Sequence, residues 1–421
     1  MSPAKSLILT CLYLSTSVFS FPADAQTTES ETEISEMRAL LYALSNRLDA
    51  LEASNAELKQ ENHRMQKSGV ESGQKIAQMK DATPASSWAN RISLKGDFRQ
   101  RYENIDEQGM DERNLNRIRA RAAIIADINE NFEVGLGIAS GGESPVSSNQ
   151  TLGGGGSSKG INLDLAYFKW QGLLNTTVYG GKFKNFLFKP GKHNLLWDTD
   201  WNPEGLGLVW NNNGHFVNVM GTWLEGDSAN GTEFSYGLQG GFRNEFANDM
   251  QLTAGIGYYS LGTSGKGSFF EDGDDFFGNS FDPNSNSYIF DYQELEVFAD
   301  LSFKLNGRSA NVFFDYVQNL DADKFDTGYA AGFRYGSTKS EGDWKFAYIY
   351  QHLEADAAFG LLVDSDFAGG GTDGKGHILK GSFAIARNIN AKITYMRTER
   401  NGNLETARDY NRLQLDLDLK Y

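Results

Sequence analysis

The sequence predicts an all-β transmembrane barrel of sixteen antiparallel strands, preceded by an N-terminal α-helical coiled coil. Three observations support this fold class: a C-terminal segment of alternating polarity, fifteen further segments with the same period of two, and connections that are short and long in turn. Strict alternation of apolar and polar residues indicates a strand with one apolar face. In a membrane barrel that face meets lipid, and the polar face meets the lumen.

The last segment, 411–421, shows the alternation most clearly. One face carries apolar residues, namely Leu413, Leu415, Leu417, Leu419 and Tyr421. The opposite face is polar throughout. A final strand of this kind suits a barrel that must close against its first strand, with lipid outside and water inside.

Fifteen earlier segments repeat this pattern. With the last one, the predicted strands are 91–102, 116–128, 132–139, 161–171, 176–184, 205–210, 216–225, 233–243, 250–261, 289–303, 310–318, 327–335, 344–353, 377–386, 391–398 and 411–421. Ten or eleven residues at about 3.3 Å each and a tilt near 40° span about 25 Å, the height of a lipid-facing band.

The connections provide a separate test, because a barrel with both termini in the periplasm alternates long external loops with tight turns. The short connections are 129–131, 172–175, 211–214, 306–308 and 388–390, and they are rich in Asn and Gly, which tight turns require. The long ones include 140–160, 185–204, 262–287 and 354–376. A large soluble β-sandwich or propeller is the alternative, but it would need inward faces dense in Val, Ile and Leu.

The first residues predict export. Lys5, an apolar run over 7–21 and the small-residue site Ala23-Asp24-Ala25 fit a signal peptide over 1–25. Cys11, the one cysteine of the chain, leaves a lipid anchor as an alternative. Cleavage after Ala25 would remove this thiol, as suits a chain that crosses an oxidising periplasm unfolded.

Residues 26–67 contain a heptad repeat that predicts a periplasmic coiled coil. Its a and d positions form the core, namely Ile34, Met37, Leu41, Leu44, Leu48, Leu51, Asn55, Leu58, Asn62 and Met65. A single amphipathic helix on a globular body is the alternative. Residues 68–87 contain Gly, Ser and Ala without periodicity and predict a linker, so the barrel domain is 88–421.

Arginines gather on the polar faces of the first two predicted strands, at Arg99, Arg101, Arg117, Arg119 and Arg121. Spaced two apart along a strand they lie about 7 Å from one another, and a guanidinium keeps its charge at any working pH. We expect a pore-lining wall biased towards anions. Pairing of these arginines with carboxylates in the wall, and a preference for cations, are the alternatives.

The third external connection, 185–204, has an unusual content of large apolar and basic residues. We expect it to fold inward as a constriction whose residues are Lys182, Lys184, Lys189, Lys192, Trp197 and Trp201. Packing as an ordinary loop at the centre of a trimer is the alternative. The acidic run 271–275 lacks the spacing of a twelve-residue calcium loop, which favours a solvated loop over a cation site.

Other classes of function have little support. The net charge of −16 argues against nucleic acid as a partner. The five histidines lack the spacing of metal or nucleophile sites, and no phosphate-binding glycine loop is present. We therefore expect no enzyme activity, no cofactor and no metal.

The plan of signal peptide, short coiled coil, linker and sixteen-stranded barrel resembles the bacterial "putative porin" family, similar in plan to the phosphate- and polyphosphate-selective trimeric outer-membrane porins. The run from Arg113 to Arg121 is similar to the arginine-bearing strand near the start of such barrels, and 180–185 resembles the strand that leads into their third external loop. The resemblance implies a homotrimer in the outer membrane.

We therefore expect an outer-membrane porin of Gram-negative bacteria that lets small hydrophilic solutes or ions diffuse through a water-filled lumen with an anion bias. The barrel would contact outer-membrane lipid and lipopolysaccharide, and the coiled coil would lie in the periplasm within reach of peptidoglycan. The alternative is a structural anchor or adhesin that tethers the membrane to the cell wall through the coiled coil.

Overall fold

The computed structural model describes residues 42, 46–65, 67, 89–226, 232–246, 249–269 and 275–421. The chain forms two compact units, residues 1–86 and 87–421. The predicted signal peptide, the linker and the acidic residues 271–274 lie outside the described residues, as do Ile34, Met37, Leu41 and Leu44 of the predicted coiled coil.

Within the described part of the first unit, residues 46–65 are helical, and every one of them is exposed. Leu48, Leu51 and Leu58 are 60%, 62% and 57% exposed. A single helix with an exposed apolar stripe does not by itself show a coiled coil, so that expectation stays a prediction. No helix among the described residues is both long and apolar enough to cross a membrane.

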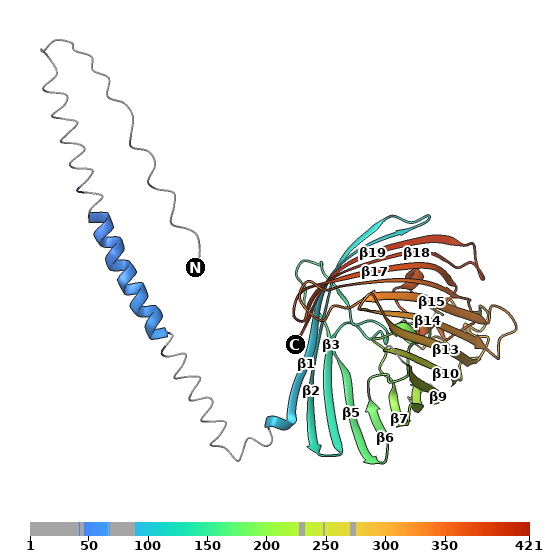
Figure 1. Cartoon of the computed structure of the whole chain (residues 1–421). Helices are drawn as coiled ribbons and strands as arrows, with labels where there is room; N and C mark the ends of the chain where they lie inside the picture. Colours follow the sequence, from blue (N-terminus) through green and yellow to red (C-terminus); the bar gives the residue numbers. More distant parts are fainter. Residues whose placement is uncertain are drawn as a thin grey trace, which may run out of the picture. The chain divides into compact units, whose positions relative to one another are not determined.

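The second unit is an antiparallel barrel (Figure 1). Its sixteen long strands, in the part of the chain that the structure describes, are β1 (Ile92–Glu107), β2 (Arg113–Asn129), β3 (Phe132–Ser140), β5 (Ile161–Leu173), β6 (Thr176–Lys182), β7 (Glu204–Asn212), β8 (His215–Glu225), β9 (Glu233–Phe246), β10 (Met250–Leu261), β13 (Tyr292–Leu305), β14 (Arg308–Asn319), β15 (Thr327–Gly336), β16 (Trp344–Leu353), β17 (Gly374–Ala386), β18 (Ile389–Arg400) and β19 (Arg408–Lys420).

Short elements lie in the loops at one end. They are β4 (Gln150–Thr151), β11 (Phe281–Asp282), β12 (Ser287–Tyr288) and the 3-10 turns η3 (Pro190–Lys192), η4 (Gly360–Leu362) and η5 (Phe367–Gly369), while η2 (Ala89–Arg91) precedes β1. Each long strand pairs with its neighbours, and β1 pairs with both β2 and β19, so the sheet closes. Figure 1 shows this closure where the blue β1 meets the red β19.

The seam between β1 and β19 is completed by Tyr421. Its backbone exchanges two hydrogen bonds with Gly96, at 3.0 and 3.1 Å, and its phenol donates to the carbonyl of Arg121 at 3.0 Å. Gly96 has no side chain, which leaves the space that the Tyr421 ring occupies. The predicted closing strand is thereby confirmed.

The expected alternation of connections is confirmed for most strand pairs, although 337–343, between β15 and β16, is longer than 108–112, between β1 and β2. One end of the barrel, here called the short-turn end, carries tight turns in which Asn213-Gly214 and Asn306-Gly307 have positive φ at both positions (47° and 80°, 50° and 75°). This geometry matches the right-handed twist of a hairpin and favours Asn-Gly. The other end, the long-loop end, carries the long connections.

The strand boundary that differs most from prediction is the end of β1, at Glu107 rather than at residue 102, while β13 begins at Tyr292 rather than at residue 289. The carboxylate of Asp291 accepts the backbone N–H groups of Thr263 and Ser264 at 2.9 and 2.8 Å, so the residues before Tyr292 are bound to the loop instead. The outward faces are apolar as expected, with Leu94, Leu136 and Ile256 more than half exposed.

The apolar core lies inside the barrel. It is built largely by two long connections, residues 183–203 (called L3) and 354–373 (called L7), which pack against inward side chains of the strands. Barrels of this size are too wide for their strand side chains alone to fill. Two inward loops therefore shape the lumen.

Candidate functional site

L3 crosses the lumen and is fixed at several strands. The backbone of Phe188 exchanges two hydrogen bonds with the Gln239 side chain of β9, at 2.7 and 3.0 Å. The N–H of Gly191 donates to Asp300 of β13 at 2.7 Å. The imidazole Nε2 of His193 lies 2.6 Å from Gln351 of β16, and burial lowers the pKa of His193 to about 3, so this ring is neutral.

The apolar residues of L3 drive this inward path. Trp197 and Trp201 are 3% and 6% exposed, and their rings stack with centroids 4.9 Å apart. Trp197 also meets the ring of Tyr259 on β10 edge-on, at 4.9 Å. Aromatic pairs at such distances add about 0.5–1.5 kcal/mol beyond the area that they bury.

L7 is a second inward loop, which the sequence analysis did not single out. The N–H of Phe359 donates to Glu294 of β13 at 2.8 Å, and the side chain of Asn279 bonds the backbone of 355, 358 and 360. Phe359, Leu362 and Phe367 are at most 2% exposed. The signal was present in the sequence, because a Phe-Gly-Leu-Leu-Val run is as unusual in an exposed loop as the tryptophans of L3.

The two loops meet at Asp198. Its N–H donates to the carbonyl of Leu362 at 2.8 Å, and its carboxylate accepts the N–H and hydroxyl of Ser365 at 3.0 and 3.1 Å. Burial, with the nearby Asp364 and Asp200, raises the pKa of Asp198 to about 8. Burial also raises the pKa of Asp364. The joint therefore holds one carboxyl group, that of Asp198, whose charge depends on pH near neutrality.

The five arginines assigned to the pore-lining wall lie on β1 and β2, with Arg99 opposite Arg119 and Arg101 opposite Arg117. Arg119 and Arg121 both contact Asp97 of β1, at 2.9 and 2.8 Å, and both contact Asp200 of L3, at 3.5 and 2.9 Å. Burial by itself would raise the pKa of Asp200, but these two guanidinium groups hold that pKa below its usual value.

Arg101 and Arg117 are paired as well. Arg101 contacts Asp416 of β19 at 2.6 Å, Asp366 of L7 at 2.9 Å and Glu103 at 3.2 Å. Arg117 lies 3.4 Å from Glu103. Arg99 donates to the amide of Asn149 at 2.5 Å and has no ion pair among the described residues.

Arg412 of β19 completes this group, and the sequence analysis missed it. It contacts Glu103 and Asp366, each at 2.8 Å. Six arginines (99, 101, 117, 119, 121 and 412) thus stand against five carboxylates (97, 103, 200, 366 and 416), which leaves 6 − 5 = +1. Two of the carboxylates, Asp200 and Asp366, come from the inward loops.

The four lysines assigned to the constriction have different environments. Lys182 pairs with Glu204 at 2.6 Å. Glu204 is two residues before Leu206 on β7 and shares its face, and Leu206 is exposed, so this pair lies on the outer face of the barrel. Lys184 lies 3.7 Å from Asp164. Lys189 donates within L3, to Asn194, Trp197 and Thr199, and burial lowers its pKa. Lys192 is exposed at the end of η3.

A second group of inward cations lies on β15, β16 and β17. Arg334 shares the inner face with buried Ala330, Lys345 with buried Ile349, and Lys380 with buried Ile378. Among the residues that the structure describes, none of the three cations has a carboxylate within 4.0 Å. We call these three residues, together with Lys192, the basic recess.

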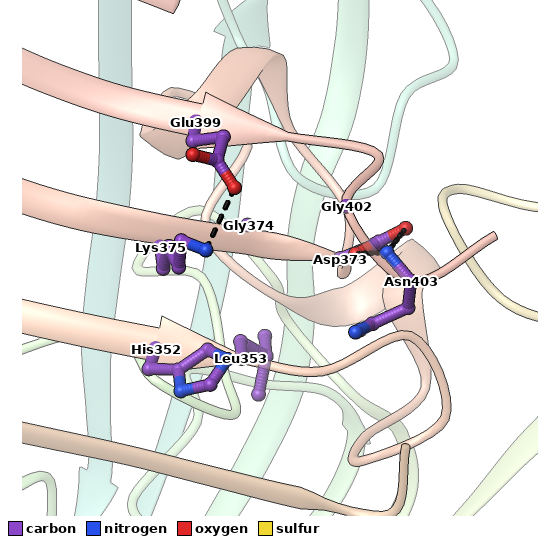
Figure 2. Close-up of a pocket in the computed structure, with 8 residues that line it drawn as sticks. All are labelled: His352, Leu353, Asp373, Gly374, Lys375, Glu399, Gly402 and Asn403. Carbon is purple, nitrogen blue, oxygen red and sulfur yellow. Dashed lines mark hydrogen bonds and ion pairs between the residues drawn. The ribbon is translucent and has the colours of Figure 1, made fainter. Parts of the chain in front are cut away.

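A small pocket at the long-loop end lies outside the lumen (Figure 2). Figure 2 shows Lys375 paired with Glu399, at 2.7 Å, and Asp373 accepting the N–H of Asn403 at 2.9 Å. Its volume of about 50 Å³ suits ordered water rather than a solute. Its groups fasten the 401–407 loop to L7, and within the described ranges no cluster of His, Cys, Asp and Glu is arranged as a metal site.

A closed barrel with an apolar outer face, a charged inner wall and loops folded into its lumen defines a bacterial outer-membrane channel of the porin class. The family model described as "Putative porin" matches residues 106–266 and 286–421, and the chain belongs to this family. Family and fold are those of a channel rather than of an enzyme. No curated protein matches the chain.

Solved structures match the chain, and one of them, OprB, shares its fold. The high-pH structure of OprB from Pseudomonas putida is 14% identical, with 79% of this chain and 95% of that chain covered and a TM-score of 0.55. A triple mutant of the Rhodopseudomonas blastica porin is 9% identical, with 78% and 100% covered and a TM-score of 0.46.

Proposed function

We propose that this porin passes small hydrophilic solutes by passive diffusion through a water-filled path that L3 and L7 narrow. The observation that carries the proposal is the joint at Asp198, where two loops from opposite parts of the chain meet inside the barrel. A barrel that served only as an anchor or adhesin would need no charged wall beside such a joint, so conduction is the better-supported function.

An anion bias is part of the proposal, and its source is mainly outside the arginine wall. That wall retains a charge of about +1, because loop and strand carboxylates neutralise most of it. The four cations of the basic recess have no such partners among the described residues. A modest preference for anions follows from the sum of the two groups.

The remaining parts of the proposal concern assembly. Residues 1–25 act as a signal peptide, 26–67 as a periplasmic coiled coil and 68–87 as a linker, and three barrels associate in the outer membrane among lipopolysaccharide. The exposed stripe of Leu48, Leu51, Leu58 and Met65 supports a helix that has partner helices in a trimer. The same helices would reach towards peptidoglycan.

The test is single-channel recording of the purified full chain in planar bilayers under a KCl gradient. Conductance steps in groups of three with an anion-selective reversal potential are expected. Arg119→Ala with Arg121→Ala removes two positive charges and the ion pairs of Asp97 and Asp200, so selectivity should move towards cations. Folded protein that shows no conductance would overturn the porin proposal and favour the anchor.

A further inference from the structure

We propose that the basic recess of Lys192, Arg334, Lys345 and Lys380 is a binding site for small dianionic solutes, such as a phosphate or a dicarboxylate. The inference rests on the proposed diffusion function and adds the class of solute. It concerns a part of the lumen that is separate from the arginine wall on β1 and β2.

The strand register places the cations around small residues. Arg334 and Lys380 lie on either side of Ala347, because Ala347 is opposite both of them. One step towards the short-turn end, Ser382 of β17 is opposite Lys345. Neighbouring strands are about 4.8 Å apart, so Arg334 and Lys380 are separated by about 10 Å with only a methyl group between them. A small anion fits between such side chains.

Lys392 borders the recess but does not contribute a free charge. It is also opposite Ser382, and its ammonium is paired with Asp418 of β19. The positive charges of Arg334, Lys392, Lys380 and Lys192 all repel Lys345. A multivalent anion stabilises cations that repel one another in this way, because it neutralises several of them at once.

L3 supplies the fourth cation. The N–H of Gly191 donates to Asp300, which fixes η3 against β13, and Lys192 follows with a positive φ of 50° and an exposed side chain. The nearest acids are already engaged. Asp300 also accepts from Asn311 at 2.5 Å, and the carboxylate of Asp364 accepts the N–H of Asp366 at 2.9 Å. Asp300 and Asp364, together with Asp366, which is paired with Arg101 and Arg412, weaken the positive potential without forming an ion pair with the recess.

Two types of donor define the ligand. The fork of Arg334 matches two oxygens of a phosphate or carboxylate, while each lysine acts as a point charge. The Arg334 guanidinium carbon lies 6.0 Å from the ring centre of Phe313, which orients the fork. A solute with two negative charges can contact the fork and a lysine together, whereas a monovalent anion cannot neutralise both.

The experiment measures block of KCl current through the full-length channel by added inorganic phosphate, succinate or acetate at pH 8. Phosphate and succinate should each reduce the current with a saturating dependence, and acetate should not. Lys345→Gln with Lys380→Gln should raise the half-blocking concentration at least about tenfold, which is about 1.4 kcal/mol. Lys192→Gln, on an exposed loop position, should raise it about threefold without affecting the fold.

The matched control is Lys95→Gln with Lys169→Gln, which removes two inward charges from β1 and β5. If this pair raises the half-blocking concentration as much as the recess variants do, net lumen charge explains block and the site is wrong. Acetate that blocks as well as succinate would overturn the assignment to dianions. A wild-type channel that conducts KCl but is insensitive to both dianions would refute the recess alone, whereas no current at all would refute the diffusion function with it.

Discussion

Asp366 is predicted to fasten L7 to the barrel wall. Its carboxylate contacts Arg101 of β1 and Arg412 of β19, at 2.9 and 2.8 Å, and Arg412 also donates to its backbone carbonyl at 3.0 Å. Although burial opposes it, these two arginines hold the pKa of Asp366 well below its ordinary value. Asp366→Ala therefore removes a charge that is ionised at every pH of interest.

The expected cost follows from the two lost contacts. Removing one partner of a buried ion pair costs about 3–5 kcal/mol, and the lower end applies because the Asp366 side chain is 22% exposed. About 3 kcal/mol corresponds to a change of about 150-fold in the ratio of docked to undocked L7. Arg101 keeps Asp416, so the barrel seam itself should stay intact.

Two measurements check this. Single-channel recordings of Asp366→Ala should show frequent excursions to a larger conductance, and chymotrypsin should cleave L7 at Phe367, which is 1% exposed in the docked loop. Asp323→Ala, at an exposed position in the 320–326 connection, is the control and should behave as wild type. A folded Asp366→Ala channel with wild-type conductance and protease resistance would show that L7 is held by its apolar packing alone.

Three further predictions concern the loops and the seam. Trp197→Ala should cost about 3–5 kcal/mol of local packing and raise the conductance, measured in planar bilayers; an unchanged conductance would mean that L3 does not limit the path. Because the pKa of Asp198 is raised to about 8, docking of L3 on L7 is strongest below about pH 4 and weakens as the pH rises through 8. Open-channel noise should therefore increase from pH 6 to pH 9, and Asp198→Asn should abolish that increase. Tyr421→Ala should lower the yield of closed barrels, measured as the fraction of protein whose mobility on a denaturing gel changes only after heating. Tyr421→Phe should keep most of that yield, because the ring over Gly96 remains.

The strands could be predicted from the sequence because their signal is local. A period of two and an Asn-Gly turn each depend on a few adjacent residues. The period of two arises because one face of each strand meets lipid and the other meets water. The inward position of Arg99 and Arg119 follows from the same parity. How much of the arginine charge is neutralised could not be predicted in this way. Arg101 pairs with Asp416, which lies at the far end of the chain, and with Asp366, which lies in a loop.

The loops were harder to predict for a different reason. L3 was identified by its aromatic residues, but its anchors at Gln239, Asp300 and Gln351 depend on where distant strands lie around the barrel. L7 was missed although its Phe-Gly-Leu-Leu-Val run was a signal, and its anchors at Asn279 and Glu294 likewise depend on distant parts of the chain. The basic recess needs the register of three strands, since each strand contributes a single cation.

The charges of the lumen divide according to what the loops reach. Asp200 of L3 and Asp366 of L7 contact four arginines of the wall, so those guanidinium groups act as docking positions for the loops. The recess cations form no ion pair with the carboxylates that the loops supply, within the part of the chain that the structure describes. Free energy gained by pairing the wall stabilises the constriction, and charge left unpaired beside it is available to a solute. Variants of the wall should therefore change gating as well as selectivity, and variants of the recess should change selectivity while leaving gating as it is.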